Sequence, residues 1–220
     1  MENFRQFIKR EWLLLLIAFI PLLLTLPVWE FLPEFMPVHW GPEGRPDSLK
    51  PVYFLPLINI GVYFLMVVLP LVDPKKENYP LFGKSYFRIR LAFLLFLSAV
   101  CIMNIGVGLG HEFDRGDLIF KGVWALIAIL GNYMGTIRSN WFVGIKTPWT
   151  LADETVWKQT HVMAGRVWFW TGTVFFTLSF SPLDVLARKA MIFTLIGVGV
   201  VWPIVYSYFV YRKVGKTDSN

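Results

Sequence analysis

Six stretches of this chain carry no Asp, Glu, Lys or Arg, and their length restricts the possible folds more than any other feature. They are residues 12–29, 51–72, 91–110, 122–137, 167–183 and 190–211. About 20 apolar residues in a helix cross the roughly 30 Å hydrocarbon core of a bilayer. A soluble helix needs a polar face, which these stretches lack. We therefore predict an all-α membrane protein with six transmembrane helices.

The predicted spans extend these stretches to nearby polar boundaries. Their ranges are 12–32, 51–72, 89–110, 118–136, 165–182 and 188–210. The first apolar run resembles a secretory signal, but it is too long and no small-residue cleavage site closes it, so we expect it to be retained. Pro21 and Pro27 predict a kink within it, because each proline removes a backbone donor.

The basic residues predict the orientation. Alternating the segments between two faces places fifteen Lys and Arg on one face and six on the other. Lys and Arg are retained on the cytoplasmic side, so we expect both termini there, in a multi-pass protein of the cell membrane in contact with its lipid. The net charge of +6 then follows from topology, and no direct nucleic-acid partner is expected.

The segment between the fourth and fifth spans is long and specific in composition. Thr150 followed by Asp153 reads as a capping box, which predicts a short interfacial helix from Thr150 to about Ala164 on the cytoplasmic side. Trp157 and His161 are four residues apart and would share one face of it. Three readings stay open: a structural cap on the helix bundle, a docking surface for a cytoplasmic partner, and a catalytic site.

The loop after the first span contains "HWGPEGRPD", residues 39–47, with four ionisable side chains and two glycines. A compact turn held by Arg45 with Asp47 or Glu43 would account for it. Recognition of a ligand or peptide would also account for it. His39 with acids of this loop or the next could bind a metal, but the spacing matches no zinc pattern.

Asparagines are the polar exceptions within the predicted spans, and no buried charge pair is evident from the sequence, which disfavours a proton-coupled pump.

Gly131 and Gly135 form a GxxxG pair, which permits a homodimer. Cys101 is the only cysteine, so no intrachain disulfide forms.

Two motifs resemble a known family. The carboxy-terminal part is similar to the SdpI family of bacterial immunity and signalling membrane proteins, and the amino-terminal part to a domain of unknown function that often precedes it. The first match comprises Gly131-Asn132, Asn140, "GIKTPWTL" at 144–151, Trp157, Thr160-His161 and Gly165; the second is "HWGPEGRPD" followed by Lys50. We accordingly expect two domains, residues 1–85 and 86–220.

The resemblance implies a non-enzymatic protein without cofactor or metal. Such proteins protect a bacterium against a secreted peptide toxin of the SdpC type. They also hold a winged-helix repressor of the SdpR type at the membrane. The expected toxin-binding residues are His39, Trp40, Gly41, Gly44, Arg45 and Asp47. The expected repressor-binding residues are Asn132, Asn140, Gly144, Lys146, Thr147, Pro148, Trp149, Trp157, Thr160 and His161.

One position departs from the family, which usually has Arg where this chain has Lys146. Lysine lacks the planar fork of arginine, so a two-pronged hydrogen bond is not expected there. Two other functions fit the residues alone. One is a small transporter or a protein that handles lipid or peptide, and the other is a metal-dependent membrane enzyme that uses the His and acids of the loops.

Overall fold

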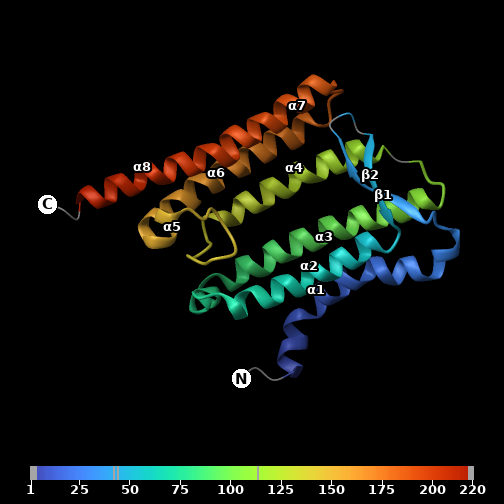
Figure 1. Ribbon diagram of the computed structural model, residues 1–220, viewed down its shortest axis with the longest axis horizontal. Coiled ribbons are helices and arrows are strands. Elements are labelled where there is room, and N and C mark those ends of the chain that lie inside the picture. The colour runs from blue at the N-terminus through green and yellow to red at the C-terminus, as the bar shows by residue number, and fades with distance from the viewer. Residues whose placement is uncertain (1–3, 42, 44, 113, 218–220) are drawn as a thin grey trace. The chain divides into compact units, whose positions relative to one another are not determined.

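The computed structural model describes residues 4–41, 43, 45–112 and 114–217, and helices make up most of them (Figure 1). The chain forms two compact units. The first comprises residues 1–68 and 90–119, and the second comprises residues 69–89 and 120–220. The fold class predicted from the apolar stretches, an all-α membrane protein, is confirmed, with one small β-hairpin in addition.

The first unit is built on long apolar helices. It holds α1 (Phe4–Thr25), the 3-10 helix η1 (Leu26–Phe31), and most of α2 (Phe54–Val72) and of α3 (Gly83–Gly108). The change from α to 3-10 geometry occurs at Leu26, beside Pro27, where proline removes a backbone donor. Thr25 satisfies one carbonyl in return, since its hydroxyl donates to the oxygen of Pro21 at 2.7 Å.

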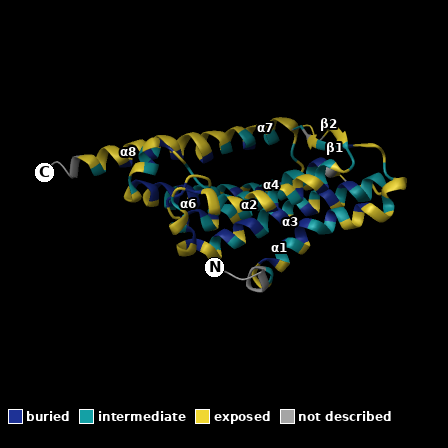
Figure 2. Ribbon diagram, turned by 60° about the horizontal axis from the view of Figure 1, so that its bottom comes forward, coloured by how far each residue is buried: buried dark blue, intermediate teal, exposed yellow. Residues whose placement is uncertain are grey.

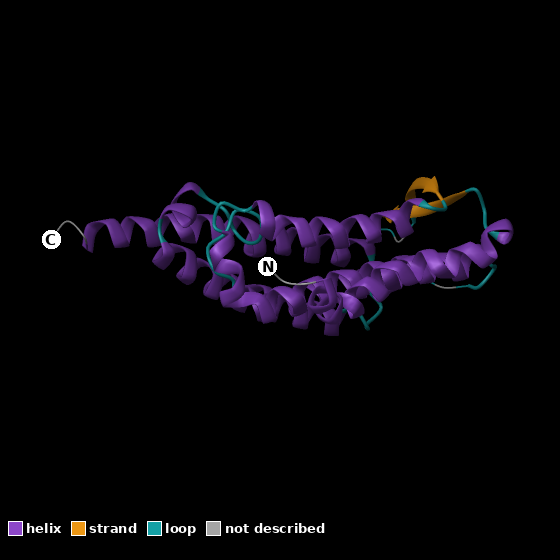
Figure 3. Ribbon diagram, turned by 90° about the horizontal axis from the view of Figure 1, so that it is seen from below, coloured by secondary structure: helices purple, strands orange, loops and turns teal. Residues whose placement is uncertain are grey.

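A two-stranded antiparallel hairpin follows η1, drawn in orange in Figure 3. Strand β1 (Phe35–Trp40) pairs with β2 (Pro46–Pro51), with irregular register near His39. Proline is tolerated at the ends and edges of so small a sheet, where no partner needs its missing donor. The sequence led us to expect an irregular proline-rich loop, so we missed these strands.

A buried ion pair lies within the helices of the first unit. The Arg90 guanidinium donates two hydrogen bonds to the Glu11 carboxylate, and the two side chains are 6% and 2% exposed. The guanidinium also lies over the ring of Tyr63. Our expectation of no buried charge pair is therefore wrong. Nothing in the sequence indicated the pair because Glu11 and Arg90 are 79 residues apart and lie on different helices.

The second unit holds the remaining helices. They are the 3-10 helix η2 (Lys76–Phe82), α4 (Arg115–Met134, mostly in this unit), α5 (Pro148–Ala152), α6 (Glu154–Leu178), α7 (Val185–Thr194), the π-helical η3 (Leu195–Val201) and α8 (Trp202–Thr217). Helices α7, η3 and α8 follow one another without a break. Trp168 of α6 secures η3, since its indole N–H donates to the Gly199 carbonyl at 2.7 Å.

Glycines let α4 and α6 pack at backbone distance. A methyl group on Gly131 would clash with the backbone of Trp168 and Phe169, and one on Gly165 would lie 2.8 Å from the Gly131 carbonyl oxygen. Gly135 faces Val162 in the same way. The predicted GxxxG pair thus packs against a helix of its own chain, and the homodimer stays a prediction.

Within the described part of the chain, five helical segments are long and apolar enough to cross a membrane. They are residues 8–31, 54–72, 76–108, 116–134 and 185–215. Their outward faces carry many large exposed hydrophobic residues, and Figure 2 shows the exposed residues along α7 and α8 in yellow. In water such a surface would be strongly unfavourable, whereas lipid tails solvate it. The protein is therefore a multi-pass membrane protein.

The predicted fifth span, 165–182, falls in α6, which is not among those five segments. At 25 residues α6 is about 37 Å long, sufficient to cross a bilayer. Arg166 and several Trp and Thr residues make it less apolar than the others. The fifth predicted span, and with it the total of six, consequently stays a prediction.

The predicted interfacial helix from Thr150 to Ala164 is wrong. Thr147, not Thr150, caps the helix α5: its hydroxyl accepts from the Thr150 amide, and the Thr150 hydroxyl accepts from the Thr147 amide. Asp153 ends α5 and caps α6, accepting from the Val156 amide at 2.8 Å. Because nothing interrupts the helix after that cap, α6 runs past residue 164 to Leu178.

Candidate functional site

Residues 137–147 join α4 to α5 without regular structure, and we name them the pinned loop. Side chains from the segment after α2 hold one side of it. Asp73 accepts a hydrogen bond from the Trp141 amide at 2.9 Å, and Lys75 donates to the Ser139 hydroxyl at 2.8 Å. Asn78 donates to the Ser139 carbonyl at 2.7 Å. These contacts join positions more than 60 residues apart in the chain, so no local pattern in the sequence marked them.

Asn140 organises the centre of the pinned loop and is fully buried. Its side-chain oxygen accepts from the amides of Phe142 and Val143, and its side-chain nitrogen donates to the carbonyls of Arg138 and Val143. A buried amide with both ends satisfied in this way stabilises one loop conformation. Asn140 is therefore a structural anchor of the loop.

Trp157 and His161 of α6 hold the other side. The Trp157 indole N–H donates to the Ile137 carbonyl at 2.8 Å, and His161 Nε2 accepts from the Ile145 amide at 2.9 Å. The two rings stack with centroids 4.0 Å apart and planes at 18°. The prediction that they share one helix face is confirmed, but the face is buried rather than at a membrane surface.

His161 is neutral in this arrangement. Its Nδ1 lies 2.8 Å from the Trp157 carbonyl, to which it donates, so Nε2 is free of a proton and accepts from Ile145. Burial lowers the pKa of His161 to about 4, partly offset by the hydrogen bond to Trp157, which favours the charged form. His161 lies before the apolar part of α6.

Gly144 makes the close approach possible. Its φ of +121° is one that residues with a side chain rarely adopt. A methyl group here would also clash with His161 Nε2 and would lie 3.3 Å from the Trp157 ring. Only glycine fits this position for both reasons.

Trp149 of α5 packs toward α8. Its indole N–H donates to the Ser207 hydroxyl, and its ring lies 5.4 Å from that of Tyr208, edge to face. The side chain is half-buried. The residues after the pinned loop thus hold α5 against the last helix of the same unit.

The expected repressor-binding residues divide by exposure. Asn140, Thr147, Trp157, Thr160 and His161 are buried; Gly144 and Trp149 are intermediate; Asn132, Lys146 and Pro148 are exposed. The structure brings these residues together around the pinned loop, except Asn132, which lies on α4 outside it. Buried side chains cannot contact a partner directly.

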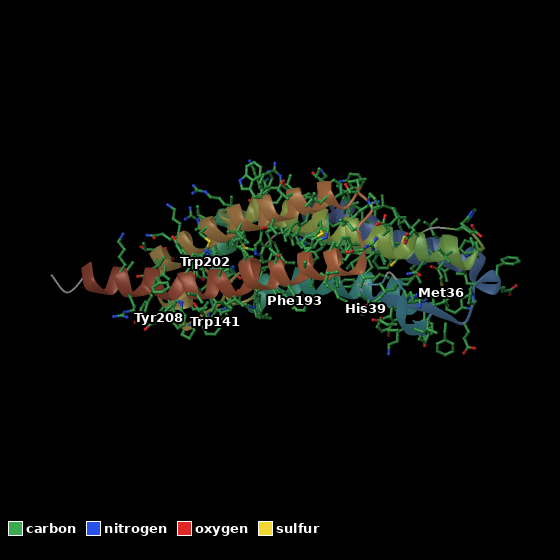
Figure 4. The ribbon with its side chains drawn as sticks, turned by 90° about the horizontal axis from the view of Figure 1, so that it is seen from above. Met36, His39, Trp141, Phe193, Trp202 and Tyr208 are labelled. Carbon is green, nitrogen blue, oxygen red and sulfur yellow. The ribbon has the colours of Figure 1, made fainter. Side chains whose placement is uncertain are left out.

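Two exposed aromatic residues of the pinned loop were missed by the sequence reasoning. Trp141 is 49% exposed and Phe142 is 36% exposed, and Lys146 beside them donates to the Phe142 carbonyl at 3.1 Å (Trp141 is labelled in Figure 4). Large aromatics and a cation exposed on a rigid loop are typical of a recognition surface. The sequence signal that could have identified them is their position between two polar residues, Asn140 and Lys146.

The hairpin holds the expected toxin-binding residues and belongs to the first unit. His39 Nδ1 lies 2.6 Å from an Asp47 carboxylate oxygen, and the two side chains are 69% and 52% exposed (Figure 4 labels His39). The Gly41 amide donates to the Arg45 carbonyl at 3.0 Å, and the backbone of Trp40 pairs with Pro46. Gly44 lies outside the described residues. Asp47 thus contacts His39, whereas one of our interpretations had paired Arg45 with Asp47 or Glu43.

The hairpin rests on a small apolar base. Met36 is buried, and Met36 and Leu32 lie against Gly108 at the end of α3, where a methyl group would lie 3.1 Å from Met36 Cε. Among the residues that the structure describes, no three His, Cys, Asp or Glu side chains come close enough to hold a metal ion.

Comparisons with known proteins place these two regions in a family context. Residues 136–207 match the SdpI/YfhL protein family, and residues 16–60 match a domain of unknown function, DUF1648. The chain is 28% identical over 210 residues to the immunity protein SdpI of Bacillus subtilis (strain 168), covering 94% of this chain and 98% of that protein. No solved structure matches. The predicted resemblance to the SdpI family is confirmed.

Proposed function

We propose that this multi-pass membrane protein, whose residues 136–207 match the SdpI/YfhL family, is an immunity protein that protects a bacterial cell against a secreted, membrane-active peptide toxin. The similarity to an immunity protein along 94% of the chain is the observation that carries the proposal. Because that similarity includes both the hairpin and the pinned loop, both regions belong to the proposed function.

The hairpin is the proposed contact for the toxin. It offers His39 and Asp47 as exposed groups, and their mutual hydrogen bond orients them without burying them. A hairpin at the end of an apolar helical unit is also suited to meet a peptide that enters the membrane surface. Arg45 is exposed beside them and supplies a cation for an acidic group of a peptide.

The pinned loop is the proposed contact for a cytoplasmic repressor of the winged-helix type. Its exposed Trp141, Phe142 and Lys146 would make the contact, while the buried residues around them hold the loop in one conformation. In this proposal Asn140, Trp157 and His161 hold the pinned loop in place and do not touch the repressor, in contrast to the direct contacts expected from the sequence.

Both contacts need the hairpin outside the cell and the pinned loop inside it, as the distribution of Lys and Arg predicts. Single cysteines introduced at Asp47 and at Phe142, in a Cys101→Ser background, test this with a membrane-impermeant thiol reagent on intact cells. We expect labelling at position 47 only. Labelling of both positions from outside would exclude the proposed division of labour.

The test of immunity is survival. A toxin-sensitive bacterium that expresses the chain should tolerate a higher concentration of an SdpC-type toxin than the same strain with an empty plasmid. The Trp141→Ala/Phe142→Ala variant should keep this protection and lose membrane recruitment of an SdpR-type repressor. Unchanged sensitivity to every toxin of that type, at equal membrane expression, would contradict the immunity function.

One observation favours transport as a second candidate. Glu11, Arg90, Tyr63, Asn59 and Ser98 form buried polar contacts between α1, α2 and α3, in helices that are otherwise apolar. Buried polar groups within membrane helices often lie along transport pathways. Flux of labelled peptide into proteoliposomes containing the purified chain would distinguish transport from immunity without flux.

A further inference from the structure

We propose that a groove between α4 and α6 of the second unit binds one anionic phospholipid. The headgroup would lie against Arg138, Lys158 and Arg166, and an acyl chain would lie along Val162, Phe169 and Trp170. The inference requires the membrane location of the chain and is independent of the immunity function.

The polar part of the groove is a cavity of about 770 Å³ next to the C-terminal end of α4. The turn after α4 and the first turns of α6 line it, with Arg138, Lys158 and Gln159 among its polar residues. One carboxylate, that of Glu154, also faces it. A phosphate group and its glycerol backbone need both the volume and the hydrogen-bond donors that this cavity offers.

A second cavity, of about 240 Å³, lies farther along the same two helices, and Arg166 and Asn132 line it together with apolar residues. It shares Gly135 and Val162 with the first, so the two adjoin along the crossing of α4 and α6. Phe169 and Trp170 close its far end, and Trp170 is 63% exposed. The groove runs along the outside of this crossing, where the glycines hold the two helices at backbone distance.

The two parts are spaced as a lipid requires. The lining residues of α6 recur on one face, from Lys158 through Val162 and Arg166 to Trp170. From Lys158 to Trp170 the helix rises about 18 Å, and the stretch from Val162 to Trp170 that would lie along the acyl chain accounts for about 12 Å of it, most of one leaflet's share of the roughly 30 Å hydrocarbon core. Arg138, Lys158 and Arg166 thus lie toward the end of the groove near the turn after α4, and Phe169 and Trp170 lie toward its other end, which matches an amphiphile with its headgroup at the membrane surface.

The charges favour an anionic headgroup. Arg138, Lys158 and Arg166 are exposed, and none forms a salt bridge with another residue that the structure describes. These three cations and the one carboxylate of Glu154 leave the groove as a whole net positive. A negatively charged lipid neutralises it, whereas a zwitterionic headgroup would bring its own cation close to these three.

Binding is tested by native mass spectrometry of the full chain in detergent, titrated with phosphatidylglycerol or with phosphatidylcholine of the same acyl length. We expect preferential binding of one phosphatidylglycerol. The Arg138→Gln/Lys158→Gln/Arg166→Gln variant should weaken it about tenfold or more. A matched control removes the same charge from three exposed residues outside the groove, as Lys9→Gln/Lys84→Gln/Arg212→Gln, and should bind as the original chain does.

A second pair of variants tests the acyl chain without changing charge. Val162→Trp places a large side chain in the groove and should weaken phosphatidylglycerol binding. Val174 is exposed on the same helix and lines neither cavity, so Val174→Trp should leave the binding unchanged. Equal thermal unfolding midpoints show that the variants fold. Four results would each overturn the proposal. Two of them are equal binding of the two lipids and full displacement of the lipid by millimolar inorganic phosphate. The other two are equal loss of binding in the charge control and equal loss of binding in the two tryptophan variants.

Discussion

The hairpin and the pinned loop both contain family motifs, yet their side chains are used in opposite ways. In the hairpin, His39 and Asp47 bind each other and remain exposed. In contrast, Asn140 of the pinned loop and His161 of α6, which holds that loop, are fully buried and their hydrogen bonds are internal. A motif that matches the family therefore stays exposed in one region and forms the internal architecture of a loop in the other.

The two motifs should respond differently to substitution. Changes in buried positions of the pinned loop should reduce the stability of the second unit first and function only as a consequence. Changes in the hairpin should alter recognition at nearly constant stability.

Gly144→Ala should have the largest effect. The added methyl group requires an unfavourable backbone conformation and clashes with His161, so we expect a loss of about 3 kcal/mol or more in the free energy of unfolding. Thermal or denaturant unfolding in a mild detergent measures it. Gly61→Ala is the matched control, because nothing lies within 4 Å of its added methyl group, and it should change stability by about 1 kcal/mol or less. Equal effects at both glycines would contradict the proposed role of Gly144.

The second unit should lose stability in acid because of His161. Its pKa is about 4 in the folded chain against 6.5 for an ordinary histidine, so the unfolded chain binds more protons between these values. The contribution is complete above about pH 6.5 and disappears as the pH falls toward 4, by up to about 3 kcal/mol.

Unfolding midpoints measured from pH 7.5 to pH 4 would show this loss. His161→Gln should be less stable at neutral pH and should flatten the profile over this interval. An equally steep profile in that variant would assign the pH dependence to other groups.

Asp73→Asn should have an intermediate effect. The carboxylate of Asp73 accepts hydrogen bonds from the Trp141 and Lys75 amides and from the Tyr79 hydroxyl. An asparagine amide would place a donor against one of them, at a cost of about 1–3 kcal/mol. Hydrogen exchange at the Trp141 amide should accelerate. Unchanged exchange there would mean that the pinned loop is held without Asp73.

His39→Ala/Asp47→Ala should have the smallest effect on stability, below about 1 kcal/mol, because an exposed pair contributes little. If the hairpin contacts the toxin, the same variant should nevertheless lose protection in the survival assay. Full protection with both side chains removed would restrict recognition to other parts of the hairpin.

The amino-acid sequence by itself determined the membrane class and most of the helices. Apolar length alone predicted the spans 51–72 and 188–210, which the helical segments 54–72 and 185–215 match closely, because lipid requires every backbone polar group of a span to be satisfied within its own helix. The motif residues likewise predicted the family. Neither inference depends on contacts distant in the chain.

The tertiary structure alone decided which motif residues are buried and what holds them. The hydrogen bonds from Asp73 and Lys75 to the pinned loop join distant segments, and so does the Glu11–Arg90 pair. The starts of α5 and α6 also depended on the folded structure. Thr147, Thr150 and Asp153 all have side chains suitable for an N-cap, and only the structure shows that Thr147 caps α5 and Asp153 caps α6. Burial and long-range hydrogen bonds depend on which segments meet, and this is a property of the folded chain that no local pattern encodes.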